Sequence, residues 1–369
     1  MPSNARNLEV IERQRRFFAG DTPGARLTFV WSGEPQPDAP PVEDLPGLVK
    51  EHYLANDGRL PDHAALEKIV RKVVDDCRRY WQWRDERVDD DLPHIVPVHF
   101  DIGIQTAVMT GIEPRLEGSW WLDCKLGWEE IDALEATPDN RWFEMFRSLN
   151  QLLWAAWEGD FHFLPFWHRS PLDAANGIRG DEIFVEMYTA PDRVKALTDW
   201  CVDCELAIEA ALAQYVQAPD DWGVGHMGFV MPPGAVWVNG DPVALISREM
   251  MRKFEQPYTG RLFTSTGGGF FHNHTKGLYQ VDQVAETPGI ILQHFNCDPN
   301  CPRVSDVLAG PVAARDNLLA ASSRTPIFPD QVQYDELDSY RPWLNEGRFA
   351  LEITCPADRV DAVIREFRR

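Results

Sequence analysis

The sequence predicts a (β/α)8 barrel, a TIM barrel formed by a single domain over residues 1–369 with helical and loop additions at the N-terminal end. Strand-like and helix-like segments alternate along the whole chain, which is typical of a parallel sheet covered by helices. About eight segments qualify as strands, the number that closes such a barrel. No G-x-G-x-x-G or Walker loop follows an early strand, which disfavours an open sheet that binds a dinucleotide or a nucleoside triphosphate.

Short apolar segments mark the strands, and apolar residues at helical spacing mark the helices. Strands are expected at 26–31, 94–100, 161–166, 229–238, the segment ending at His274, 289–295, 326–328 and 348–354. Helices are expected at 7–20, 62–84, 104–110, 141–158, 171–180, 191–215, 247 to just before Pro257, 279–286, 305–321, 334–344 and 357–368. Asp62 is the expected N-cap of its helix, and Gly310 followed by Pro311 predicts a break.

Composition excludes several classes of function. Hydrophobic residues make up 44% of the chain, enough for a large core, and the net charge of −22 argues against a nucleic-acid partner. No apolar run approaches the roughly 18 residues of a membrane span, and the first residues lack the apolar core of a signal peptide. Seven cysteines, an odd number in a large chain, fit a reduced intracellular protein. We therefore expect a cytoplasmic protein that acts on a small molecule, away from membranes and nucleic acids.

In a barrel of this kind, functional residues lie at the C-terminal ends of the strands. The side chains expected there are Trp31, His99, Asp101, His168, Arg169, Asn239, Asp241, His272, Gln293, His274, His294 and Cys355. His272 and His274 stand two apart on an aromatic strand between glycines, so their imidazoles point to the same side and could bind one metal ion. The alternative is structural, with one histidine hydrogen-bonded in the core and the other capping the loop.

The order of several motifs along almost the whole chain resembles the uroporphyrinogen decarboxylase superfamily. The matching segments are 12–20 with 26–30, 170–175 with Arg179 and Gly180, 188–191, and 241–247 with 254–258. The last pair is similar to the superfamily's D…LSPEMFEEFVLPY run and is the most specific match. This resemblance implies the same barrel fold, and it also implies the homodimer that family members often form.

The resemblance is nearer to the zinc-dependent methyltransferases of this superfamily than to its porphyrin decarboxylases. The decarboxylases use an N-terminal segment with an arginine pair to bind the porphyrin carboxylates, whereas residues 28–34 here contain no arginine. The methyltransferases have a His-x-Cys at one strand end and a cysteine at the last. His272 and His274 correspond to the first motif, with histidine in place of cysteine, and Cys355 corresponds to the second.

This correspondence implies a zinc ion held by His272, His274 and Cys355, with a fourth position for a substrate thiol. Zinc lowers the pKa of a bound thiol, so that the thiol reacts as a thiolate. The function expected from the resemblance is methyl transfer between a corrinoid on a partner protein and a thiol-type or other small acceptor.

Two alternatives stay open. In the first, the same barrel is a metal-free lyase or decarboxylase of a small carboxylated substrate. Asp241 would be its acid–base group, His272 or His168 the partner, and Arg169 the anchor of the substrate carboxylate. Asp241 could equally be the N-cap of the following turn. Further substrate contacts are expected from His99, Asp101 and Asn239. In the second alternative, the barrel binds a corrinoid protein or a small ligand without catalysis.

Overall fold

The computed structural model describes residues 2–20, 24–122, 124–215, 222 and 224–368. Its strands are β1 (Arg26–Ser32), β2 (Arg115–Glu117), β3 (Ser119–Trp121), β4 (His168–Arg169), β5 (Val224–His226), β6 (Phe229–Met231), β7 (Val236–Asn239), β8 (Gly269–His274), β9 (Ile290–Asn296), β10 (Ile327–Pro329), β11 (Val332–Gln333) and β12 (Phe349–Cys355). Its α-helices are α1 (Pro2–Ala19), α2 (Leu45–Ala55), α3 (His63–Asp85), α4 (Ile102–Thr110), α5 (Trp128–Ile131), α6 (Arg141–Ala156), α7 (Pro171–Arg179), α8 (Glu182–Thr189), α9 (Pro191–Leu212), α10 (Arg248–Met250), α11 (Gln256–Ser265), α12 (Val281–Val284), α13 (Val304–Ala309), α14 (Val312–Arg324), α15 (Leu337–Tyr340) and α16 (Val360–Phe367).

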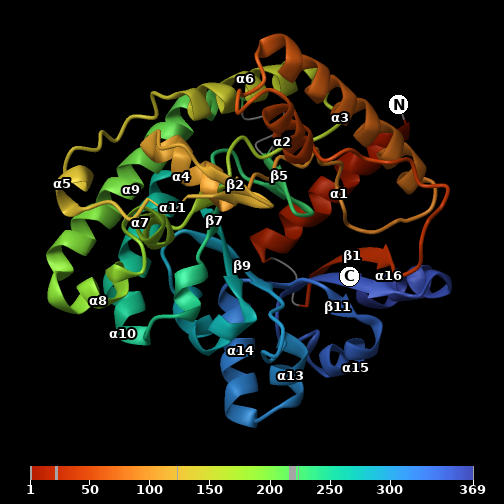
Figure 1. Ribbon diagram of the computed structural model, residues 1–369. Helices are drawn as coiled ribbons and strands as arrows, with labels where there is room; N and C mark the ends of the chain where they lie inside the picture. Colours follow the sequence, from red (N-terminus) through yellow and green to blue (C-terminus); the bar gives the residue numbers. More distant parts are fainter. Residues whose placement is uncertain (1, 21–23, 123, 216–221, 223, 369) are drawn as a thin grey trace.

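Eight strands form one parallel sheet in the order β1-β12-β10-β9-β8-β7-β4, with β11 also paired to β12. The sheet runs through the middle of the molecule and helices surround it, with α7 to α11 on one side and α13 to α16 on another (Figure 1). The predicted α/β architecture with a large parallel sheet is therefore confirmed. None of the described helices is long and apolar enough to cross a bilayer.

The strand expected at 94–100 is largely absent as a ladder. Only an isolated parallel bridge joins Ile95 to His162, because Pro97 has no backbone N–H to donate. Pro165 similarly limits the strand expected at 161–166, and regular pairing resumes at β4. At the edge of β1, two carboxylates take the place of a paired strand. Asp91 Oδ2 accepts the Thr28 N–H at 2.9 Å, and Asp90 Oδ2 accepts the Val30 N–H at 2.8 Å.

Two other expectations needed correction. The strand expected at 229–238 is divided by the turn at Pro232 and Pro233 into β6, in an antiparallel hairpin with β5, and β7. The helix expected to end before Pro257 continues through a π-helical turn, η3 (Met251–Glu255), into α11, and Pro257 lies in the first turn of α11. The predicted break at Gly310 and the predicted N-cap at Asp62 are confirmed.

Aromatic side chains from three strands of the sheet pack around Phe229. The ring of Phe229, from the β5–β6 hairpin, lies 5.1 Å from Phe29 on β1, 4.8 Å from Phe328 on β10 and 5.5 Å from Phe270 on β8, measured between centroids. This hairpin therefore packs its apolar side chain against strands β1, β8 and β10. The polar side chains gather at the C-terminal ends of β7 to β10.

Candidate metal centre

Three potential metal ligands converge at the ends of β7 and β8. His272 and His274 are on β8, and Asp241 begins the short 3-10 helix η2 (Asp241–Ala244) that follows β7. Asp241 Oδ1 lies 3.1 Å from His274 Nε2 and 3.7 Å from His272 Nε2. The candidate ligand atoms of these three residues all lie within 4.8 Å of one another. Two imidazoles and one carboxylate form a ligand set that zinc and other transition metals use.

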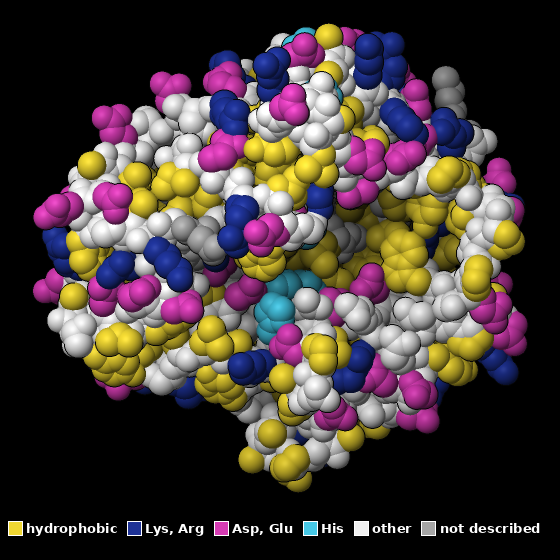
Figure 2. Space-filling view, in the orientation of Figure 1, with side chains coloured by type: hydrophobic (Ala, Val, Ile, Leu, Met, Phe, Trp, Pro, Cys, Tyr) yellow, Lys and Arg dark blue, Asp and Glu magenta, His cyan; other side chains and the backbone are white. Residues whose placement is uncertain are grey.

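The parallel register of the two strands produces this convergence. Asn239 on β7 lies opposite His272, so the chain reaches Asp241 alongside His274. The intervening Gly240 allows the close approach, because a Cβ atom there would lie 2.2 Å from the ring of Phe271. In the space-filling view, histidine side chains form a patch near the centre of this face, beside a hollow walled by hydrophobic side chains (Figure 2).

A chain of hydrogen bonds fixes which nitrogen of His272 carries a proton. His294 Nε2 lies 3.3 Å from Asp330 Oδ2, and a carboxylate can only accept, so this nitrogen carries the hydrogen. His294 Nδ1 is then an acceptor, and it lies 2.7 Å from His272 Nδ1, which must donate. The remaining nitrogen of His272, Nε2, is left with a free lone pair directed toward the Asp241 side of the site.

His274 is oriented in the same way by a second carboxylate. Its Nδ1 lies 2.7 Å from Asp298 Oδ1, and Asp298 is itself held by the backbone N–H of Lys276 at 3.2 Å from Oδ2. Nε2 of His274 therefore also faces Asp241. Metal-binding histidines usually donate their second ring N–H to a carboxylate or another acceptor, which orients the ring and selects the tautomer. Both histidines here satisfy that pattern.

The two imidazoles have opposite electrostatic surroundings. Burial, together with the neighbouring His294 and His274 rings, lowers the pKa of His272 well below its ordinary value of 6.5. His272 is thus neutral, the form that binds a metal. Contact with Asp241, reinforced by Asp298, raises the pKa of His274 to about 9 despite partial burial. A metal ion at this place would displace a proton from His274.

Asp241 is the carboxylate of the group. Its Oδ1 is buried and forms an ion pair with His274 Nε2 at 3.1 Å, without the geometry of a regular hydrogen bond. Buried carboxylate oxygens are normally hydrogen-bonded or metal-bound. The interpretation of Asp241 as an N-cap finds no support, because its side chain makes no capping hydrogen bond to η2, and Gly240 holds the N-cap position.

Cys355, the expected third ligand, does not lie with the histidines. It is 2% exposed and packs with Val30, Ile353 and Ile364, in the apolar cluster between β12 and the helices. Alternation along β12 explains this placement, since Phe349, Leu351 and Ile353 share its face while Glu352 points to the other. Asp241, and not Cys355 as the resemblance implied, is the third residue that lies with the two histidines.

His168 also points away from the triad. It is fully buried, and its Nε2 lies 2.7 Å from Glu209 Oε1 on α9, in the helix layer. Arg169, the next residue, lies on the other face, but its guanidinium is already engaged by Asp173, with Nε–Oδ2 and Nη2–Oδ1 distances of 2.9 Å. The structure therefore places both predicted residues next to carboxylates of the protein itself.

The remaining predicted contacts, Asn239, His99 and Asp101, have different surroundings. Asn239 is 3% exposed, and its Oδ1 has no partner among the described residues. The ring of His99 lies 3.7 Å from that of Trp167, centroid to centroid, and burial lowers the pKa of His99 to about 4. Asp101 accepts the backbone N–H of Trp120 at 2.8 Å, so it anchors the β2–β3 hairpin.

Sequence reasoning missed Asp298 and Asp330, the two carboxylates that orient the histidines. A signal was present, because Asp298 follows β9 and Asp330 follows β10 directly, and both strands end at the edge that carries the site. No model of a known protein family matches the chain, and a search of curated proteins likewise gives no match.

Proposed function

We propose that this protein is an enzyme with a single zinc ion held by Asp241, His272 and His274 at the mouth of a (β/α)8 barrel. The observation that supports it most is the convergence of Asp241 Oδ1 with the Nε2 atoms of two histidines whose Nδ1 atoms are already engaged. Three protein ligands leave a coordination position for substrate, as is usual for catalytic and not for structural zinc. The eight-stranded parallel sheet supports the barrel.

The reaction we propose is methyl transfer between a corrinoid on a partner protein and a thiol-type or other small acceptor, as the sequence resemblance implies. Zinc in this site would supply a Lewis acid that keeps a substrate thiol deprotonated. The role of the surrounding residues is to fix the orientation and protonation of the two histidine ligands. Asp330 and His294 keep the proton of His272 on Nδ1, and Asp298 does the same for His274. The aromatic rings around Phe229 reach the site through Phe328, which stacks on His294.

A metal-free lyase is the second candidate, and one observation favours it. His274 lies between the carboxylates of Asp241 and Asp298, and its pKa of about 9 makes it an imidazolium at neutral pH. Such a group can protonate a carbanion after loss of carbon dioxide. Arg169 is less suited to anchor a substrate carboxylate than the sequence indicated, because Asp173 already occupies its guanidinium.

Metal analysis of protein purified without a histidine tag tests the zinc site. We expect about one zinc per chain in the natural protein and in a control, His63→Ala, which removes an exposed imidazole. His272→Ala and Asp241→Asn should each lose most of the metal. Natural protein that stays metal-free in zinc-supplemented medium would reject this site.

Methylcobalamin with 2-mercaptoethanol tests the reaction, followed by the absorbance change as the methyl group leaves cobalt. Acceleration by zinc-loaded protein, abolished in His272→Ala, is the expected result. A zinc-loaded protein that gives no acceleration with free or protein-bound methylcorrinoid would refute methyl transfer and leave the metal site standing. Turnover of a carboxylated substrate by metal-free protein would favour the second candidate.

A further inference from the structure

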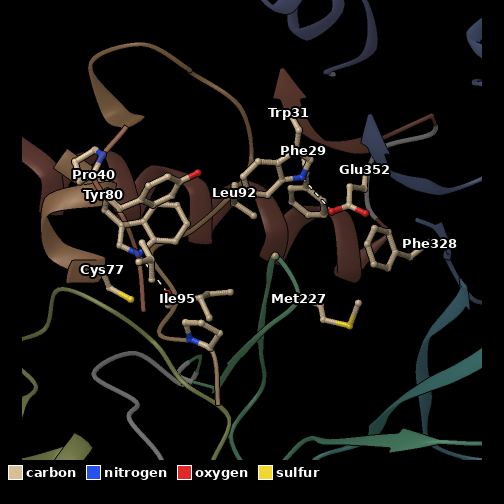
Figure 3. Close-up of a pocket in the computed structure, with 14 residues that line it drawn as sticks. Phe29, Trp31, Pro40, Cys77, Tyr80, Leu92, Ile95, Met227, Phe328 and Glu352 are labelled. Carbon is tan, nitrogen blue, oxygen red and sulfur yellow. Dashed lines mark hydrogen bonds between the residues drawn. The ribbon is translucent and has the colours of Figure 1, made fainter. Parts of the chain in front are cut away.

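A cavity that is not lined by the metal ligands lies between β1, β10, β12 and helix α3. It has a volume of about 450 Å³, within the range of small-molecule sites. Five aromatic side chains contribute to its walls: Phe29, Trp31, Tyr80, Trp81 and Phe328. Figure 3 shows these walls, with Ile95 and Met227 on one side and one carboxylate, Glu352, beside Trp31 and Phe328.

Among the described residues that line this cavity, Glu352 is the one that carries a charge. Its Oε1 accepts the indole N–H of Trp31 at 3.0 Å, and its Oε2 accepts the backbone N–H of Gln331 at 3.2 Å. Within the described part of the chain it forms no ion pair with a lysine, arginine or histidine. Burial raises its pKa, so its charge is held at a cost that a cationic ligand would relieve.

The aromatic side chains that line the cavity also suit a cationic ligand. The indole N–H of Trp31 is used by Glu352 and that of Trp81 by the Ile95 carbonyl at 3.2 Å, so neither donor is available to a ligand. One face of the Trp81 ring stacks on His94, with centroids 5.2 Å apart. Arg84 lies 5.1 Å from the Trp31 ring centroid, but its charge is neutralised by Asp90 at 2.7 Å. Aromatic faces around a carboxylate are the usual surroundings of an alkylated ammonium.

We propose that this cavity binds a small organic cation, an alkylated ammonium on an apolar or aromatic skeleton, with its charge placed between Glu352 and the aromatic faces. The overall charge of −22 would draw such a ligand toward the protein. Neutral and anionic ligands of the same size gain the apolar contacts and lose the electrostatic ones, so the site selects by charge.

The cavity and the candidate metal centre share a wall. Phe328 lines the cavity, and its ring stacks on His294 with centroids 4.8 Å apart, while His294 contacts His272. If the cation is the substrate of the proposed reaction, that part of the inference rests on the proposed function. Its binding does not, because no cavity-lining residue belongs to the metal ligands.

Titration calorimetry with benzyltrimethylammonium and with phenylacetate, at low and moderate salt, tests the proposal. The cation should bind at least about tenfold more tightly than the anion. Glu352→Gln, which keeps the size of the side chain, should abolish this preference, whereas Glu346→Gln, a loss of the same charge from an exposed position, should keep it. Equal binding of the two probes by natural protein would overturn the inference.

A second pair of variants guards against misfolding of Glu352→Gln. Tyr80→Leu removes an aromatic face and should weaken cation binding several-fold, while Tyr80→Phe keeps the face and should bind nearly as the natural protein does. Equal weakening in both would refute a role for the aromatic wall. His272→Ala should still bind the cation, which separates this inference from the metal site. Loss of cation binding in His272→Ala would move the ligand out of this cavity and refute it.

Discussion

Replacing Asp330 by asparagine should weaken zinc binding more than replacing it by alanine, although asparagine is the closer substitute. Asp330 Oδ1 accepts the Cys297 N–H at 3.1 Å, so an asparagine would keep its carbonyl oxygen there and turn its amide NH2 toward His294 Nε2. His294 Nε2 would then have to accept and Nδ1 to donate. His272 Nδ1 would become the acceptor, and the proton of His272 would move to Nε2, the atom that faces the metal.

Two features of the structure set the size of this effect. Loss of an outer carboxylate typically weakens metal binding 10- to 100-fold, about 1.4 to 2.8 kcal/mol. The contact between Asp330 and His294 is long at 3.3 Å, which favours the lower end for alanine, where His294 can still adopt the useful tautomer. Asparagine opposes that tautomer inside a site where Asp330 is only 7% exposed, so it should reach about 100-fold.

Competition against a fluorescent zinc chelator at pH 7.5 measures the three affinities. Asp335→Asn, which removes an exposed carboxylate from the neighbouring segment, is the control and should bind zinc as the natural protein does. Long-range nitrogen–proton NMR spectra of the metal-free variants report the tautomer of His272 directly. If the asparagine variant bound zinc as tightly as the alanine variant, or if His272 kept its proton on Nδ1 in it, the hydrogen-bond relay would be refuted.

Three further predictions concern other buried groups. Glu255 is fully buried, and burial raises its pKa from an ordinary value of 4.5 to about 7. Its contribution to stability is therefore present below pH 4.5 and is lost as the pH rises through 7. Urea unfolding should show Glu255→Gln gaining about 3 kcal/mol of unfolding free energy relative to the natural protein between pH 4.5 and 8, and the same pH dependence of unfolding free energy in both proteins would contradict this. Arg169→Gln leaves the Asp173 carboxylate buried without its cation and should cost about 3 to 5 kcal/mol of unfolding free energy. The control, Arg248→Gln, breaks a surface ion pair and should cost less than about 1 kcal/mol. Similar losses in both variants would be evidence against a structural role of Arg169. Cys355→Ala should retain zinc while His274→Ala loses it, and metal analysis that shows the reverse would restore the thiol as a ligand.

Much of the fold could be predicted because strand–helix alternation is a local property of the sequence. The errors fall where proline interrupts an apolar run, at Pro97, Pro165 and Pro232, since a run of apolar residues marks burial but not the hydrogen bonds of a ladder. Spacing alone brought His272 and His274 to one side of a strand, because residues two apart share a face whatever the register.

The third ligand required information that spacing does not contain. The sequence places Asp241 at a strand end, but only the pairing of β7 with β8 shows that it faces the two histidines. For Cys355, the sequence alone indicates on which face of its strand the side chain lies. Phe349, Leu351 and Ile353 have the same parity as Cys355 and form a strictly apolar series, which indicates the face that packs against helices.

The carboxylates of Asp90 and Asp91 at the edge of β1 also affect association between copies of the protein. An unpaired strand edge exposes backbone N–H groups that can recruit a strand from another chain. Here the N–H groups of Thr28 and Val30 are already bound by Asp91 and Asp90, and Arg84 holds the Asp90 carboxylate in place at 2.7 Å. A foreign strand would have to displace two buried charges before it formed its first hydrogen bond. This edge of the sheet is thereby protected against pairing with a strand of another copy.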